Sequence, residues 1–233
     1  MNRSALAGML ASLRGRAGAI GGWLAGVRGG HRAIFTRIYR RNAWGSAESV
    51  SGPGSTRDRG ADFSPEVAEL LARLGTRVLL DAPCGDCNWI GPVADAVPAY
   101  VGVDVVPELV ARCREHLAGD GRTFLCADLT RDPLPPADVV LCRDCLVHFS
   151  FADARAALLN FRRSGARWLL TTTFVDVRKN LDIRTGGWRV LNLQAPPFSF
   201  PEPEALIDER CTHSGGRYRD KCLGLWRMDA LPL

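Results

Sequence analysis

The chain has 233 residues, of which 46% are hydrophobic, so it is long enough for one domain with a sizeable core but too short for two ordinary domains. Arginines or glycine pairs interrupt every apolar run before it reaches the ~18 residues that a membrane span needs, which predicts a soluble protein. The net charge of +5 arises in residues 1–47, which hold eight arginines and no acid, whereas residues 48–233 carry −3. Because residues 48–233 are nearly neutral, they argue against a basic surface that binds nucleic acid.

Residues 1–45 form a basic leader, which we expect to be poorly ordered or helical. Short apolar segments alternate there with arginines, and glycine pairs interrupt any long helix. Three interpretations stay open: a weakly ordered tail, a helix that docks on a surface, and an acid-free targeting peptide. The main domain is expected over residues 46–233.

Strands and helices alternate from residue 64 onward. A helix is expected from Ser64 to Gly75, and it is followed by strand 77–83, helix 88–97, strand 99–104, helix 107–117, strands 122–128 and 137–143, helix 151–163 and strand 166–174. This alternation predicts an α/β, doubly wound fold with a mainly parallel sheet and helices on both faces. After an insert at 175–203, two apolar runs joined by a Ser-Gly-Gly turn are expected to close the sheet as an antiparallel pair.

Three successive strands end in an acid, namely Asp81, Asp104 and Asp128. Any one of them alone is commonly a turn residue, but the carboxyl ends of parallel strands meet at one edge of the sheet, where ligands bind. The turn after the first strand has a single glycine, Gly85, so it lacks the G-x-G-x-x-G of a dinucleotide-binding fold and disfavours a dehydrogenase. Asp81 and Asp86 would repel a pyrophosphate, and Asp104 is placed to accept hydrogen bonds from ribose hydroxyls.

The segment DAPCGD, followed by an acid at the end of the next strand, resembles the class I S-adenosylmethionine-dependent methyltransferases from about Ser46 to the C-terminus. The resemblance implies a Rossmann-like seven-stranded sheet with an antiparallel last strand, and S-adenosyl-L-methionine as cofactor. It also implies that the loop from Asp81 to Asp86 holds the methionine part, that Asp104 binds the ribose and that Asp128 meets the adenine amino group. The residues expected at the cofactor are Asp81, Pro83, Cys84, Gly85, Asp86, Asn88, Trp89, Asp104, Asp128, Leu129 and Arg143.

This sequence departs from the common loop pattern of that superfamily, because Pro83 and Cys87 stand where glycines are usual. The segments RNAWGSAESVSGPGS, LCRDCLVHFSF, LLTTTF and LNLQAPPFSFPEP further resemble a small bacterial group of methyltransferases of unassigned substrate. The resemblance therefore leaves the acceptor open.

Asp144 and His148 follow the fourth strand and are the candidate catalytic residues. Four residues apart, they share a face if a helical turn follows the strand, and the carboxylate then orients the imidazole as a general base. The alternative, which we favour, is that His148 packs below the rim and Asp144 caps the turn. Arg143 is expected either to pair with an acid of the rim or an acidic substrate, or to be solvated.

The long insert at 175–203 is expected to form a lid over the carboxyl end of the sheet. The residues expected to bind the acceptor come from this insert and from the leader: Tyr39, Trp44, Trp188, Arg189 and Asn192. The alternative is that the insert is a surface loop whose aromatic residues only hold it in place.

Two Cys-x-x-Cys pairs, Cys84 with Cys87 and Cys142 with Cys145, have the spacing of zinc ligands. A zinc tetrathiolate would fill the loop that the cofactor needs, so we expect no metal and interpret the thiols as small apolar side chains. Eight cysteines are too sparse for a disulfide framework, which favours a reducing, cytoplasmic location.

The leading hypothesis is a cytoplasmic methyltransferase that methylates a small-molecule or sugar-like acceptor, at oxygen rather than nitrogen. Two alternatives remain: a nucleic-acid methyltransferase guided by the basic leader, and a non-catalytic scaffold that binds the cofactor without turnover. The sequence leaves the oligomeric state open.

Overall fold

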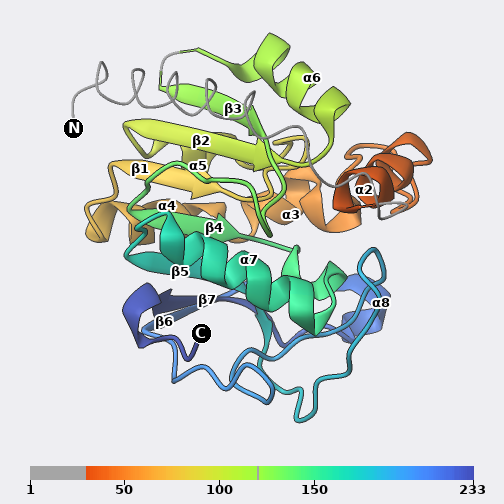
Figure 1. Ribbon diagram of the computed structural model, residues 1–233, viewed down its shortest axis with the longest axis vertical. Helices are drawn as coiled ribbons and strands as arrows, with labels where there is room; N and C mark the ends of the chain where they lie inside the picture. The colour runs from red at the N-terminus through yellow and green to blue at the C-terminus, as the bar shows by residue number, and fades with distance from the viewer. Residues whose placement is uncertain (1–29, 120) are drawn as a thin grey trace.

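The computed structural model describes residues 30–119 and 121–233, without the side chains of residues 213 and 214, and is built around a seven-stranded sheet (Figure 1). The strand order is β3-β2-β1-β4-β5-β7-β6. Strands β1 to β5 pair in parallel, and β7 runs antiparallel between β5 and β6. The strands are β1 (Val78–Asp81), β2 (Ala99–Asp104), β3 (Arg122–Cys126), β4 (Val139–Cys142), β5 (Trp168–Phe174), β6 (Ala205–Asp208) and β7 (Lys221–Arg227). This confirms the doubly wound, mainly parallel sheet with an antiparallel last strand.

Each face of the sheet buries its own hydrophobic core. Successive residues of a strand point to opposite faces, so Leu79 packs into one core and Leu80 into the other. Helices α4 (Ser64–Arg73), α5 (Gly91–Asp95) and α6 (Pro107–Leu117) contribute to the first core, and α7 (Phe151–Arg163) to the second. The remaining helical segments are α2 (His31–Arg40), η1 (Pro53–Ser55), α3 (Arg57–Ala61), η2 (Leu146–His148), α8 (His213–Gly216) and η3 (Met228–Ala230).

Local capping residues explain where the two long helices begin. Helix α6 starts at Pro107, whose missing N–H costs nothing at a helix start, and α7 follows Ser150, whose hydroxyl accepts a hydrogen bond from the backbone N–H of Asp153 at 3.1 Å. The predicted helix over 88–97 is shorter than expected, because residues 82–90 form the loop that turns around the end of β1 and only Gly91–Asp95 is helical.

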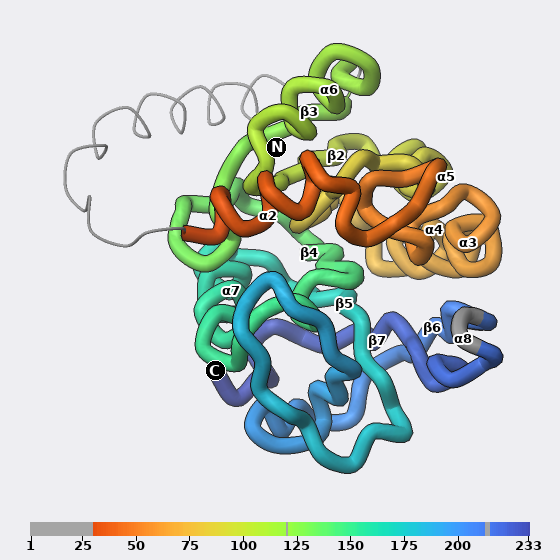
Figure 2. The backbone as a smooth tube through the Cα atoms, turned by 90° about the vertical axis from the view of Figure 1, so that its right-hand side faces the viewer, coloured from red at the N-terminus to blue at the C-terminus, as the bar shows by residue number. Residues whose placement is uncertain are grey.

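Helix α2 lies at the edge of the sheet toward which the parallel strands run (Figures 1 and 2). We call residues 31–44, which comprise α2 and the turn after it, the strap. The expected boundary at residue 46 stays a prediction, and the expectations for residues 1–29 lie outside the described residues. Within the described part of the chain, no helix is long and apolar enough to cross a membrane.

The insert 175–203 packs mainly against the second core. Its side chains Leu191, Leu193, Phe198 and Phe200 are buried among residues of α7 and β5. Asn180 anchors the insert internally, because its amide donates to the carbonyls of Asn192, Ala195 and Pro196. Hydrophobic burial therefore holds this segment at the side of the sheet.

Candidate active site

A cavity of about 990 Å³, including space open to solvent, lies at the carboxyl ends of the parallel strands β1, β2 and β4. The strap, the loops after the strands and the segment before α3 all contribute lining residues. Its polar and charged lining residues are His31, Ser51, Ser55, Asp81, Asp86, Asp104, Asp128, Arg143, Asp144 and His148.

Asp81, Asp104 and Asp128, which we call the rim acids, all line this one cavity. Adjacent parallel pairing of β3, β2 and β1 brings their carboxyl ends side by side. Asp81 accepts a hydrogen bond from the hydroxyl of Tyr100 at 2.6 Å. Burial raises the pKa of Asp81 to about 7, although the bond from Tyr100 lowers it.

Asp104 is held by the backbone of two loops. One carboxylate oxygen accepts the N–H of Val106 at 2.9 Å, and the other accepts the N–H of Gly85 at 3.3 Å. Burial raises the pKa of Asp104 to about 6, although these bonds to the charged form lower it. Each oxygen keeps acceptor capacity, which suits a ligand with paired hydroxyls.

Asp128 is the most strongly ionised of the rim acids. Burial opposes its charge, but hydrogen bonds from His31 and Thr130 lower the pKa of Asp128 to about 2. His31, which the sequence analysis did not single out, therefore belongs to the site. Its partner lies 97 positions along the chain, so no local pattern indicated the contact.

The loop after β1 is fixed by a short serine-containing segment. Asp86 accepts hydrogen bonds from the hydroxyls of Ser49 and Ser51 at 3.0 Å and from the N–H of Val50 at 2.9 Å. Gly85 has a φ of +54°, and a side chain there would meet the hydroxyl of Ser51. The expected loop residues Pro83, Cys84, Gly85, Asp86 and Trp89, together with Leu129, line the cavity.

Two residues expected at the cofactor have other partners. The amide of Asn88 donates to Glu48 at 2.7 Å and to the carbonyl of Ser55 at 3.1 Å, and Asn88 does not line the cavity. In this arrangement the side chain ties the loop to the preceding segment, and its expected role at the cofactor stays a prediction.

Arg143 lines the cavity, but its hydrogen bonds go elsewhere. Its guanidinium donates to Glu209 at 2.5 and 3.1 Å and to the carbonyl of Gly54 at 2.8 Å. The rings of Phe63 and Trp89 lie 4.6 and 5.0 Å from the guanidinium carbon. Cation–π contacts and a buried ion pair thus hold Arg143 in the wall of the cavity.

His148 and Asp144 both line the cavity but do not bond to each other. Nδ1 of His148 lies 2.7 Å from the carbonyl oxygen of Gly187, so this nitrogen carries the proton and Nε2 of the neutral ring carries the lone pair. Burial lowers the pKa of His148, which favours that neutral ring.

Asp144 instead pairs with Lys221 at 2.6 Å. Burial opposes its charge, but Lys221 and Arg143 hold the pKa of Asp144 below its ordinary value. The hydrogen bond between Asp144 and the imidazole that the first of the two interpretations needs is not formed here, because the lysine of β7 takes the carboxylate.

The residues expected to bind the acceptor divide into two groups. Tyr39 and Trp44 line the cavity, and the Trp44 ring lies 5.1 Å from the His148 ring. The structure does not bring Trp188, Arg189 and Asn192 to this cavity. Trp188 packs on Phe174 and Tyr218, Arg189 donates to the carbonyls of Leu146 and Val147, and Asn192 donates to those of Val175 and Val177.

The expected role of the insert as a lid stays a prediction. The insert touches the site through the Gly187 carbonyl, while the strap covers the cavity with Phe35, Tyr39 and Trp44. Among the described residues, no three His, Cys, Asp or Glu side chains are grouped so that they could hold a metal ion. The four cysteines of the two Cys-x-x-Cys pairs are free and buried.

Comparison with known proteins agrees with this geometry. A family profile for a methyltransferase domain matches residues 79–165. An uncharacterized methyltransferase of Mycobacterium tuberculosis is 26% identical over 160 residues, which cover 61% of this chain and 78% of that protein. The same values hold for an uncharacterized methyltransferase of Mycobacterium bovis.

Solved structures of methyltransferases share the fold. The 1,6-didemethyltoxoflavin-N1-methyltransferase of Burkholderia thailandensis superposes with a TM-score of 0.56 at 18% identity, over 88% of this chain and 92% of that one. Human N-acetylserotonin methyltransferase does so with a TM-score of 0.54 at 16% identity, over 83% and 58%. The methyltransferase-domain match over residues 79–165, the strand order and the three rim acids in one cavity agree with the resemblance to the class I S-adenosylmethionine-dependent methyltransferases.

Proposed function

We propose that this protein transfers a methyl group from S-adenosylmethionine to an oxygen atom of a small-molecule acceptor. The observation that carries the proposal is the position of His148, which lines the same cavity as the rim acids and has its proton fixed on Nδ1. A neutral imidazole with a lone pair on Nε2 is the group that removes a proton from a hydroxyl near neutral pH.

The residues of the cavity fit the cofactor. Both oxygens of Asp104 retain acceptor capacity for the two ribose hydroxyls, since each takes one backbone N–H. Val105, Val106, Leu109 and Leu129 line the cavity and offer an apolar surface to the adenine ring. When bound, S-adenosylmethionine supplies a methyl group activated by its sulfonium.

The chain's own part in the reaction is positioning and removal of one proton. An alcohol must lose its proton as the new carbon–oxygen bond forms, and His148 accepts it at Nε2. Because the leaving group is already good, holding the acceptor in line supplies most of the acceleration. Trp44 packs on the His148 ring and restricts the space in which an acceptor is held.

The strap gives the acceptor side of the cavity an aromatic wall. Phe35, Tyr39 and Trp44 line it. Such a wall favours a small acceptor with a flat apolar face, as an aromatic ring or one face of a sugar provides. We therefore propose a hydroxylated small molecule of this shape as substrate.

The test has two stages. Isothermal titration with S-adenosylhomocysteine establishes cofactor binding, and absence of binding at high concentration would refute the proposal. A panel of hydroxylated aromatic compounds and sugars is then screened for release of S-adenosylhomocysteine. Turnover that falls in His148→Gln but persists in His116→Gln, whose ring is exposed on α6, supports His148 as the base. Turnover with any acceptor would also eliminate a non-catalytic scaffold.

One observation favours the nucleic-acid alternative. Exposed arginines of α2, of the turn after it and of the loop after β3 line a groove beside α6, namely Arg32, Arg37, Arg40, Arg41 and Arg131. This alternative predicts RNA binding that weakens steeply with salt and is lost in an Arg37→Glu, Arg41→Glu double variant. RNA binding that both substitutions leave unchanged would remove it.

A further inference from the structure

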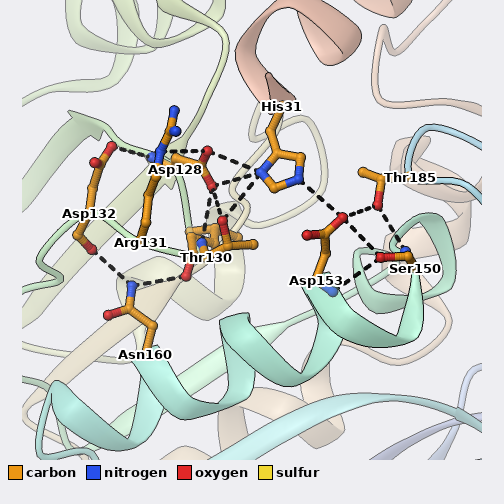
Figure 3. Close-up of polar contacts among 10 residues, drawn as sticks. His31, Asp128, Thr130, Arg131, Asp132, Ser150, Asp153, Asn160 and Thr185 are labelled. Carbon is orange, nitrogen blue, oxygen red and sulfur yellow. Dashed lines mark hydrogen bonds and ion pairs between the residues drawn. The ribbon is translucent and has the colours of Figure 1, made fainter. Parts of the chain in front are cut away.

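His31, the first residue of the strap, bridges two carboxylates from different parts of the fold (Figure 3). Its Nδ1 lies 3.0 and 3.1 Å from the two oxygens of Asp128, and its Nε2 lies 3.2 Å from Asp153 at the start of α7. The ring also stacks on Phe149, with centroids 5.6 Å apart and planes inclined by 15°. The side chain is 18% exposed.

The acceptor positions of Asp128 are filled in this arrangement. Besides His31, one oxygen accepts the hydroxyl of Thr130 at 2.7 Å and the N–H of Thr130 at 3.1 Å. The other oxygen lies 3.2 Å from Nε of Arg131. A carboxylate has about four lone-pair sites, so no further N–H donor can bond to Asp128 unless one of these leaves.

We propose that His31 competes with the adenine of the cofactor for Asp128, so that cofactor binding requires the strap to release this carboxylate. This inference rests on the proposed function, in which Asp128 meets the adenine amino group. His31 presents the features that an adenine would present there: a flat ring stacked on Phe149 and an N–H donor directed at Asp128.

Asp153 gives His31 a second acidic partner, which remains when His31 releases Asp128. It is anchored by the hydroxyls of Ser150, at 3.0 Å, and of Thr185. Because Nε2 of His31 already contacts Asp153, the imidazole keeps an acidic partner when Nδ1 leaves Asp128. His31 is thus a positioning residue. It contacts both Asp128 and Asp153 before the release and Asp153 alone after it.

The competition depends on pH in a defined direction. The hydrogen bond to Asp128 raises the pKa of His31 above its ordinary value, against the effect of burial. Below that pKa the ring is a cation that donates from both nitrogens, and above it the ring loses one proton and pairs less strongly. Cofactor binding should therefore tighten as pH rises, by up to about tenfold per pH unit if one proton leaves for each cofactor bound.

Other charged groups contribute to the same pH profile and must be separated from His31. The groups facing His31 are Asp128, Asp153 and, through Asp128, Arg131. Asp81 and Asp104, with pKa values of about 7 and 6, titrate in the same cavity and also favour cofactor binding when charged. The informative quantity is therefore the difference between wild type and a His31 variant.

The experiment measures the Kd of S-adenosylhomocysteine by isothermal titration at pH 5.5, 7.0 and 8.5. His31→Phe retains a ring for stacking and removes both donors, so it should bind several-fold more tightly than wild type at pH 5.5 and approach wild type at pH 8.5. Asp153→Asn removes one of the charges that raise the His31 pKa, so the wild-type profile should move to lower pH. His116→Phe, on the exposed side of α6, is the matched control and should follow wild type.

Parallel pH profiles for wild type and His31→Phe would overturn the inference, as would weaker binding by His31→Phe at every pH. The second result would make His31 part of the binding wall. Thermal melts establish that each variant is folded, and Asp153→Asn carries the test if His31→Phe is not. Failure of the proposed function is a different outcome, in which wild type and variants alike bind no S-adenosylhomocysteine.

Discussion

Replacing Asp104 by asparagine should stabilise the fold while weakening cofactor binding. Asp104 is 7% exposed, and burial raises its pKa to about 6 from an ordinary 3.8. Above pH 7 that difference corresponds to a cost of about 3 kcal/mol for keeping the buried carboxylate charged. Asparagine removes the cost but offers one oxygen where the carboxylate offers two, which sacrifices a backbone hydrogen bond worth about 1 kcal/mol. The net gain for the variant is about 2 kcal/mol.

The sign of this effect changes with pH. Because the folded-state pKa of Asp104 is raised, the stability linked to it is present below about pH 3.8 and is lost as pH rises through about 6. Asp104→Asn should thus be slightly less stable than wild type at pH 4 and more stable at pH 8. Urea unfolding at pH 4, 6 and 8 measures the difference in free energy, with the exposed Asp58→Asn on α3 as control.

The same variant should bind S-adenosylhomocysteine more weakly at pH 8. Loss of charge-assisted hydrogen bonds to the ribose costs about 1–3 kcal/mol, which raises Kd by roughly 5- to 150-fold. A stability difference that does not change with pH, or a variant less stable than wild type at pH 8, would refute the account of a desolvated carboxylate. Unchanged affinity would remove Asp104 from the cofactor site.

Three further predictions concern other parts of the cavity. Lys221→Met leaves the Asp144 carboxylate without its 2.6 Å partner and should cost about 3–5 kcal/mol in urea unfolding, and a loss below 1 kcal/mol would contradict a desolvated ion pair. Gly85→Ala places a Cβ against the Ser51 hydroxyl at a positive φ, so thermal melts should show a loss of about 1–2 kcal/mol; an unchanged melting temperature would mean that the loop moves freely. His148→Gln should lower the methyl-transfer rate by about 100- to 10,000-fold and abolish its rise with pH below about 6.5, and a retained pH profile would identify another base.

The fold was predictable where the determining signals are local. Pro107 and Ser150 mark helix starts by the chemistry of their own backbone and side chain, and α6 and α7 begin where these residues indicate. The rim acids were predictable for a related reason. Each ends or follows its own strand, and parallel pairing then brings strand ends together without further information from the sequence.

The contacts of residues near the rim acids could be predicted only with the tertiary structure in hand. Arg143 and Glu209 are 66 positions apart, and their pairing depends on β6 lying at the edge of the sheet. Nothing near Arg143 in the sequence distinguishes this buried ion pair from a solvated side chain. The insert is ambiguous in the opposite way. Its polar residue Asn192 is typical of a binding surface, but the side-chain amide donates to backbone carbonyls within the insert.

In the strap, the spacing of histidine and aromatic residues indicates a face that packs on the domain, although the basic composition suggests an exposed segment. His31, Phe35 and Tyr39 recur every four residues, which places them on one face of α2, and all three line the cavity. The arginines of α2 lie outside this repeat, so the positive charge of this helix belongs to the exposed face and says little about the face toward the sheet. A basic stretch with an aromatic and histidine repeat of this period is therefore better interpreted as a covering element of the neighbouring domain than as a detached tail.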